Sequence, residues 1–114
     1  MPVLDAFVHQ NSVFAISTTQ NLNHAADVLV IVDVADGIGQ GLPSSVTVAG
    51  VAAAMDMQQA DLSRWYIYRA PAGNEAVTVT WPIACNHNWI AESLTSTLVD
   101  PPYFEASNGA QGVS

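Results

Sequence analysis

Apolar and polar residues alternate along most of this chain with the period of two that is typical of β-strands. The alternation is clearest in residues 45–49, 77–80 and 89–98, and it is weaker in residues 4–9 and 13–18. Residues 27–34 instead form a dense β-branched run. Such a run predicts a central strand that is covered on both faces, or that turns one face toward a partner. With Gly, Pro and Asn turns between them, these segments predict about eight short strands.

Two stretches predict hairpins. Residues 63–69 are aromatic and β-branched, residues 77–80 alternate Val with Thr, and Ala70-Pro71-Ala72-Gly73-Asn74 between them has the Pro and Gly of a tight turn. We therefore expect these two segments to pair as neighbouring strands. A shorter hairpin is expected around Ala49-Gly50.

Several features predict interruptions of the strands. Asn11-Ser12 is expected to break the first strand, residues 19–24 to form a polar loop, and Pro82 to end a strand before a loop at residues 83–88. The composition of residues 52–62 is compatible with a helix. Because the neighbouring segments all favour strands, we interpret them as a strand followed by a loop.

Together these patterns predict an all-β fold, an antiparallel β-sandwich of the Ig-like or jelly-roll type. A single domain is expected to cover residues 1–114. Residues 1–10 are expected to be an N-terminal arm or an edge strand, and residues 101–114 a C-terminal tail. No Cys…Trp…Cys spacing is present, which argues against a true immunoglobulin domain.

The charge balance is strongly acidic. The 114 residues have a formal net charge of −8, only 11% of them are charged, and none is lysine. Nucleic acids and anionic membrane surfaces attract clustered Lys and Arg, so neither is an expected partner. A surface with few charged and many small residues is typical of one that other protein covers, and compositional bias produces the same statistics.

Processing signals are sparse. Cys85 is the only cysteine, which excludes an intrachain disulfide. The N-terminal residues lack the basic start of a signal peptide, and the longest apolar run, residues 28–32, is too short to span a bilayer. We therefore expect a protein that stays soluble in a cytoplasm or joins an assembly there.

Candidate chemistry is weak, and we expect no enzyme, no cofactor and no metal site. Cys85 and His87 lie on the same segment without an orienting third group, so we interpret them as structural. His9 and His24 do not have ligand spacing with His87 or with each other. Asp33 and Asp36 beside Gly37 are the best acids for Ca²⁺, but the chain has no D-x-D-x-D-G loop.

The aromatic segment offers a binding surface instead. Strand alternation places Trp65 and Ile67 on one face and Tyr66 and Tyr68 on the other, so one face is core and the other is available for a protein interface or for stacking on sugars. The only two cations, Arg64 and Arg69, are five residues apart and therefore face opposite sides. Either an intersubunit or capsid salt bridge or an intrachain ion pair is expected for them.

The segment PSSVTVAGVAAAMDMQQADLSRWYIYRAPAGNEAVTVTW resembles a β-sandwich module of bacteriophage structural proteins. That module has a hairpin like SVTYGG, an aromatic strand like ELWYL, a PPAGT turn and a TVTVT strand. ADVLVIVDVAD matches its NRLLVVAVS strand in character, and residues 102–109 correspond to its TPxxASNG-like segment. The resemblance covers most of residues 27–109, and the chain departs from it at Ala52-Ala53-Ala54 and in residues 85–89.

The resemblance implies a virion structural protein, specifically a capsid decoration or cement protein on the capsid surface, assembled in the host cytoplasm. Its implied partners are the major capsid protein and further copies of the chain, as a trimer in proteins of this kind. The candidate interface residues are Arg64, Arg69, Tyr66 and Tyr68, with Tyr103 and Phe104 behind Pro101 and Pro102 as an anchor. The alternative is a carbohydrate- or receptor-binding module of a phage tail or fibre that uses the aromatic face.

Overall fold

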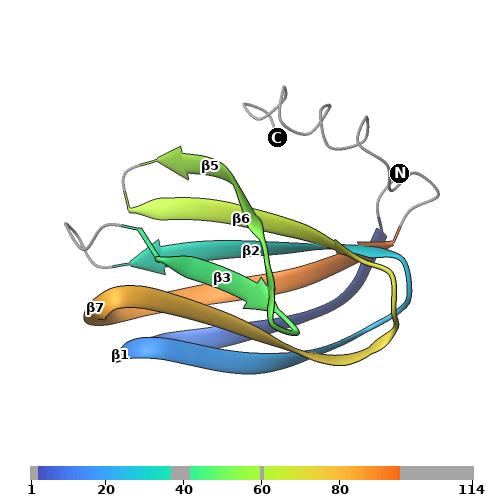
Figure 1. Ribbon diagram of the computed structural model, residues 1–114, viewed down its shortest axis with the longest axis horizontal. Coiled ribbons are helices and arrows are strands. Elements are labelled where there is room, and N and C mark those ends of the chain that lie inside the picture. The colour runs from blue at the N-terminus through green and yellow to red at the C-terminus, as the bar shows by residue number, and fades with distance from the viewer. Residues whose placement is uncertain (1–2, 37–41, 60, 96–114) are drawn as a thin grey trace.

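The computed structural model describes residues 3–36, 42–59 and 61–95 of the chain (Figure 1). Strands account for 85% of these residues, and no helix occurs among them, so the prediction of an all-β fold is confirmed. The strands are β1 (Val3–His24), β2 (Val28–Asp36), β3 (Ser45–Val48), β4 (Val51–Ala52), β5 (Ala54–Gln59), β6 (Leu62–Arg69) and β7 (Gly73–Thr95).

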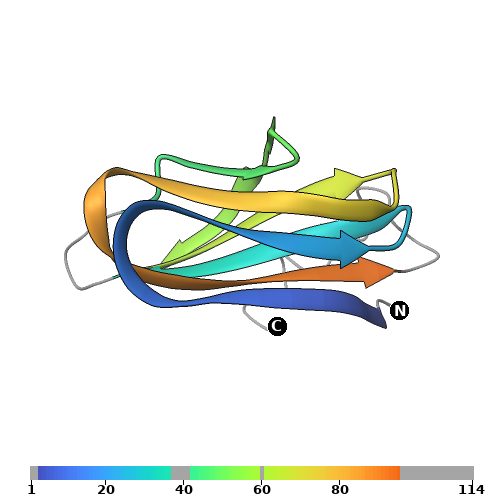
Figure 2. The ribbon, with the colours of Figure 1, turned by 90° about the horizontal axis from the view of Figure 1, so that it is seen from below.

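The strands form one antiparallel sheet in the order β4-β3-β7-β2-β6-β5, with β1 beside β7. This sheet is nearly closed into a barrel. Both β1 and β7 turn back on themselves at one end of the molecule, as Figure 2 shows, so that each contributes a half to opposite sides. We call residues 11–17 of β1 and 80–87 of β7 the bend. The first half of β7 pairs with β3, and its second half pairs with β2.

Two long bent strands replace the several short ones that we expected. Asn11-Ser12 does not break β1, because the extra residue there is absorbed as a bulge between Gln10 and Val13. Residues 19–24 are strand rather than loop, since they pair in register with the start of β7. Pro82 and residues 83–88 likewise lie within β7. The ladder skips Pro82 at the register shift in the bend, so its missing N–H costs no pairing with β1.

The two predicted hairpins have different outcomes. β3 and β4 do pair across Ala49-Gly50, with φ of 52° and 80° at these residues, as the primed two-residue turns require. The predicted hairpin of residues 63–81 is wrong, although both of its strands exist. β6 pairs with β2 and β5, while β7 pairs with β1, β2 and β3. The Pro-Gly turn therefore carries the chain from one part of the sheet to another.

The core fills the space between the facing halves of the sheet. β2 is central as predicted, with every second residue buried on the inner side and strands on both of its edges. Residues 3–10 form the start of an edge strand, which was one of the two expectations for the N-terminus. The buried apolar side chains are Leu22, Val28, Val30, Val32, Val34, Val46, Val48, Val77, Val79, Trp81, Cys85, Trp89 and Ala91.

Candidate functional site

An apolar outer face lies on the half of the sheet that contains the start of β1, the end of β7, β2 and β6. Strand alternation and register align its residues in cross-strand rows. We call this surface the outer face; its rows are Leu4-Leu94-Leu29-Tyr68, Phe7-Glu92-Ile31-Tyr66 and His9-Ile90-Asp33-Arg64.

The first two rows are almost entirely apolar or aromatic, and several of their side chains reach solvent. Phe7 is 60% exposed, and Ile90 in the third row is 47% exposed. The solvent side of an antiparallel sheet normally carries polar residues. A contiguous apolar surface in that position is typical of surfaces where another molecule binds.

The charges of the outer face are acidic on balance. The Arg64 guanidinium donates from Nε to Asp33 Oδ1 at 2.7 Å and from Nη2 to Oδ2 at 3.3 Å. Asp56 and Glu92 lie close enough to raise the pKa of Arg64 further, after the larger contribution of the Asp33 hydrogen bond. Three carboxylates thus surround one cation. A shallow groove of about 290 Å³ runs beside this ion pair, and its apolar lining includes Ala35, Met57, Leu62 and Ile90.

The side chains of the aromatic strand β6 divide between two faces as the sequence predicts, and the structure shows which face is inward. Trp65 and Ile67 pack against the core, while Tyr66 and Tyr68 belong to the outer face. The Tyr68 hydroxyl donates to Asp27 Oδ1 at 2.5 Å, and this hydrogen bond is the main reason why the pKa of Tyr68 is raised. The outer face therefore presents tyrosine rings beside aliphatic side chains.

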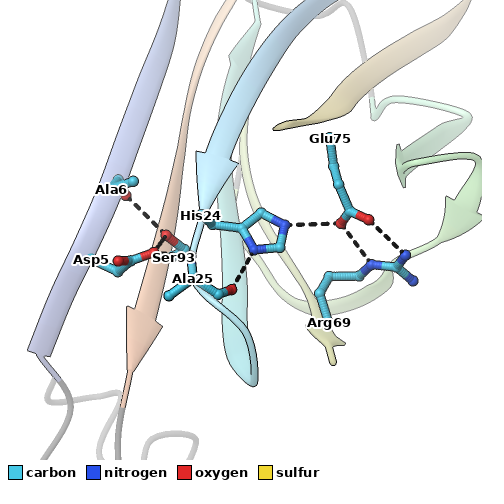
Figure 3. A network of polar contacts seen from close by, with 7 residues as sticks. All are labelled: Asp5, Ala6, His24, Ala25, Arg69, Glu75 and Ser93. Atoms are coloured by element: carbon cyan, nitrogen blue, oxygen red, sulfur yellow. Dashed lines mark hydrogen bonds and ion pairs between the residues drawn. The ribbon is translucent and has the colours of Figure 1, made fainter. Parts of the chain in front are cut away.

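Arg64 and Arg69 face opposite sides, as expected, and both are paired within the chain. Arg69 points inward, where its Nε and Nη2 donate to the two oxygens of Glu75 at 2.9 and 3.0 Å. Figure 3 shows the polar network that this pair begins, at the end of the sheet away from the bend. These intrachain bonds do not test an interface role for either arginine.

His24 completes that network from the last position of β1. Its Nε2 lies 2.9 Å from Glu75 Oε1, and its Nδ1 lies 2.7 Å from the carbonyl oxygen of Ala25. The Arg69 hydrogen bond and, to a smaller extent, His24 hold the pKa of Glu75 down at about 2. Both atoms that face the ring are acceptors, so the two hydrogen bonds form together only when both ring nitrogens carry a hydrogen.

A neighbouring part of the network joins the two ends of β1 to β7. Asp5 Oδ2 accepts from the backbone N–H of Ala25 at 2.8 Å and from the Ser93 hydroxyl at 2.9 Å. The Ser93 hydroxyl is therefore engaged with Asp5 rather than with His24 (Figure 3). A nucleophile and base pair is not assembled here, and the network acts as a clamp on the end of the sheet.

A second buried histidine, His87, sits at the bend. Its Nε2 lies 2.9 Å from the Thr18 hydroxyl, which itself accepts from the indole N–H of Trp89 at 2.9 Å. The His87 Nδ1 lies 3.1 Å from the carbonyl oxygen of Cys85, and the ring stacks on Trp81 with 3.8 Å between centroids. Since the Thr18 hydroxyl has its own hydrogen to donate, His87 is satisfied as a neutral ring with the proton on Nδ1.

The surroundings of His87 do not support cysteine chemistry. Burial raises the pKa of the Cys85 thiol, and the negative charge of Asp36 raises it further, so the reactive thiolate is disfavoured. Burial also raises the pKa of Asp36. The Trp81 indole N–H faces the Asp36 carboxylate and opposes this rise in part, although neither group makes a hydrogen bond of good geometry among the described residues. Cys85 and His87 thus occupy the core, as the structural interpretation expected, but on a strand rather than a loop.

Other candidate sites from the sequence are not assembled within the described part of the chain. No group of three His, Cys, Asp or Glu residues there is placed to hold a metal ion. Asp33 is instead the partner of Arg64. The proposed anchor residues Pro101, Pro102, Tyr103 and Phe104 lie outside the described residues.

The outer face was only partly predictable from the sequence, because the β1 side of it depends on long-range strand pairing. The pattern in residues 89–98 did separate Ile90, Glu92 and Leu94 from the inward residues, and the structure confirms this as far as Thr95. Phe7 gave no comparable signal, because only the pairing of β1 with β7 places it beside Glu92.

The comparisons with known proteins add no relative. A scan against protein-family models, a search of curated proteins and a search of solved structures each find no match. The described residues contain no helix that is long and apolar enough to cross a membrane.

Proposed function

We propose that this protein is a bacteriophage virion structural protein, a capsid decoration or cement protein that binds the major capsid protein by non-covalent contacts and stabilises the shell. The observation that carries the proposal is the outer face, an apolar surface on the solvent side of a sheet. A binding role also fits the buried histidines, since both are fully engaged in structural hydrogen bonds. The specific assignment to phage capsids rests on the resemblance of residues 27–109.

The side chains of the outer face suggest which kind of partner surface it binds. Leu4, Phe7 and Ile90 offer apolar contact area, while Asp33, Asp56 and Glu92 outnumber the one arginine. A complementary capsid surface has an apolar centre with Lys or Arg around it. Repetition of such a contact over a symmetric shell gives an avidity that exceeds each single contact.

We further propose that the nearly closed sheet is a β-sandwich of the Ig-like or jelly-roll type. Support comes from the bend, where β1 and β7 fold back so that their halves face each other across the core (Figure 2). On the basis of the resemblance, we also propose that the protein forms a homo-oligomer, most simply a trimer, and that it lies on the capsid surface of the virion.

A carbohydrate- or receptor-binding module of a phage tail or fibre is the second candidate. The observation that favours it is the position of Tyr66 and Tyr68 on the same outer face as Phe7. Aromatic rings on one exposed face are a surface on which sugar rings stack.

The test is co-sedimentation of the purified protein with empty capsids from a panel of tailed phages, together with binding to cell-wall glycans. We expect capsid binding that weakens as salt is added, because acidic residues contribute to it. Phe7→Ser should weaken this binding about tenfold, the effect of losing an interface anchor. Phe14→Ser is the matched control, because Phe14 is 67% exposed on the same strand but lies at the bend.

Two results contradict the proposal. If Phe7→Ser and Phe14→Ser weaken capsid binding equally, the outer face is not the surface that contacts the capsid. If the protein binds glycans but no capsid of the panel, the carbohydrate-binding module becomes the supported function and the decoration protein is rejected.

A further inference from the structure

The long strand β1 is an edge strand. Within the described residues it pairs with β7 alone, so the backbone groups on its other side meet no strand. Residues 17–24 are the longest part of β1 that pairs without a register shift, matching residues 73–80 of β7 one to one. A regular unpaired edge of this kind is a template on which another strand can add.

The usual protections of an edge strand are absent from residues 17–24. They contain no Pro, Lys, Arg, Asp or Glu, and their titratable residue, His24, is buried. The two bulges caused by extra residues of β1 lie elsewhere, at Asp5 and between Gln10 and Val13. Natural edges without charge, proline or bulge pair readily with other strands.

The charge distribution of the chain suggests which strand pairs with this free edge of β1. The chain has ten acids and a net charge of −8, so two copies repel each other over most of their surfaces. β1 contributes only one of those acids, Asp5, which already accepts from Ala25 and Ser93. Two copies that meet at residues 17–24 therefore bring their least charged edges together.

We propose that residues 17–24 pair antiparallel with the same residues of a second copy of this chain, around a two-fold axis. The contact continues the sheet from β7 through β1 into the partner's β1. It is isologous, since each copy offers the same edge. The contact is a dimer contact, which differs from the trimer that the resemblance implies, and it is independent of the capsid partner.

The side chains of this segment provide a matched pair of variants. The hydroxyls of Thr19 on β1 and Thr78 on β7 lie 2.9 Å apart on the same face of the sheet. A lysine at position 19 of both copies places like charges on the paired edges, whereas a lysine at position 78 lies one strand further in. Both substitutions remove the same hydroxyl contact.

The experiment is sedimentation velocity of the full chain over a range of concentrations, at low and high salt. We expect a monomer–dimer equilibrium that salt strengthens, because screening relieves the repulsion between acidic copies. Thr19→Lys should raise the dimer dissociation constant at least about tenfold, while Thr78→Lys leaves it near the wild-type value. Thermal melting of both variants checks that they are equally folded.

Three results overturn the proposal: a wild-type protein that stays monomeric at the highest concentration and salt, equal weakening by the two lysine variants, and a trimer that Thr19→Lys does not disturb. Failure of the capsid proposal is read separately, because Phe7→Ser changes the outer face and leaves residues 17–24 intact. The opposite salt responses distinguish the two contacts as well.

Discussion

The two buried histidines occupy opposite ends of the β1–β7 pair and show opposite chemistry. His24, which is 4% exposed, lies where β1 ends, and His87, which is 1% exposed, lies at the bend. Each ring has a partner for both of its nitrogens. Burial is therefore nearly the same at both sites. What differs is whether the partners accept or donate.

His24 faces only acceptors, the Ala25 carbonyl and the Glu75 carboxylate, so its two bonds form together only when both ring nitrogens carry a hydrogen. Arg69 shares the same carboxylate, and the three side chains form a buried ionic group that joins β1, β6 and β7. His87 faces the Thr18 hydroxyl, which has a hydrogen to donate, and burial lowers the pKa of the ring. The lesson is that two core histidines of similar burial meet partners of different hydrogen-bonding character: acceptors only at His24, and a hydroxyl that can donate at His87.

Removing the carboxylate from the His24 end should have the largest effect. In Glu75→Gln, the Arg69 guanidinium loses its ionic partner, although the Arg69 side chain is only 16% exposed and the Glu75 side chain only 14%. Breaking a buried ion pair on one side leaves an uncompensated charge, and we expect a loss of about 3 kcal/mol in the free energy of unfolding. Chemical denaturation at neutral pH measures it.

Glu92→Gln is the control for that experiment, because Glu92 is a half-buried carboxylate on the outer face, outside the buried ion pair of Glu75 with Arg69. The contrary result is a loss of unfolding free energy in Glu75→Gln that is no larger than the loss in Glu92→Gln. In that case the ion pair of Glu75 with Arg69 does not stabilise the His24 end of the sheet.

At the His87 end, Thr18→Val should have the next largest effect. The hydroxyl of Thr18 satisfies both His87 Nε2 and the Trp89 indole N–H, and the substitution leaves both without a partner. Unpaired buried polar groups cost about 1–3 kcal/mol each, and relaxation of the ring reduces the sum, so we expect about 2 kcal/mol. Thr19→Val on the same strand loses one exposed hydroxyl contact and should cost less than about 0.5 kcal/mol. Similar losses in the two variants would mean that the Thr18 network contributes little.

The smallest expected effect is a decrease in the free energy of unfolding at acidic pH. The pKa of His87 is lowered by burial from 6.5, so below that pH the unfolded chain takes up a proton that the folded chain does not. Stability should therefore fall as the pH drops from about 6.5, by at most about 1.4 kcal/mol per pH unit. The charge of Asp36 opposes the lowered pKa of His87 in part.

The carboxyl of Asp36 itself contributes with the opposite sign. Because burial raises its pKa, the carboxylate costs stability at higher pH, and this cost is relieved as the pH falls through the folded pKa. Unfolding measured from neutral pH to about pH 5 should show a shallower slope in His87→Gln than in the wild type. A slope that the substitution leaves unchanged would assign the acid sensitivity to another group.

The strand segments were predictable because alternation is a local property of a pleated chain. Residues 45–48, 63–69 and 89–95 have the faces that their sequences indicate, and the Ala49-Gly50 turn joins the strands that it should. The interruptions at Asn11-Ser12 and Pro82 were mispredicted, because bulges and register shifts keep a strand continuous where a local pattern breaks.

By itself, the sequence determined the all-β class, the central position of β2, the division of the β6 side chains between two faces, and the opposite directions of Arg64 and Arg69. All of these follow from residues close together in the chain. Only the tertiary structure decided that β6 does not pair with β7, that Phe7 joins the outer face, and that His24 and His87 have different kinds of hydrogen-bond partner. Each of these depends on contacts between residues far apart in the sequence, where loop closure and register rather than local propensity select the partner.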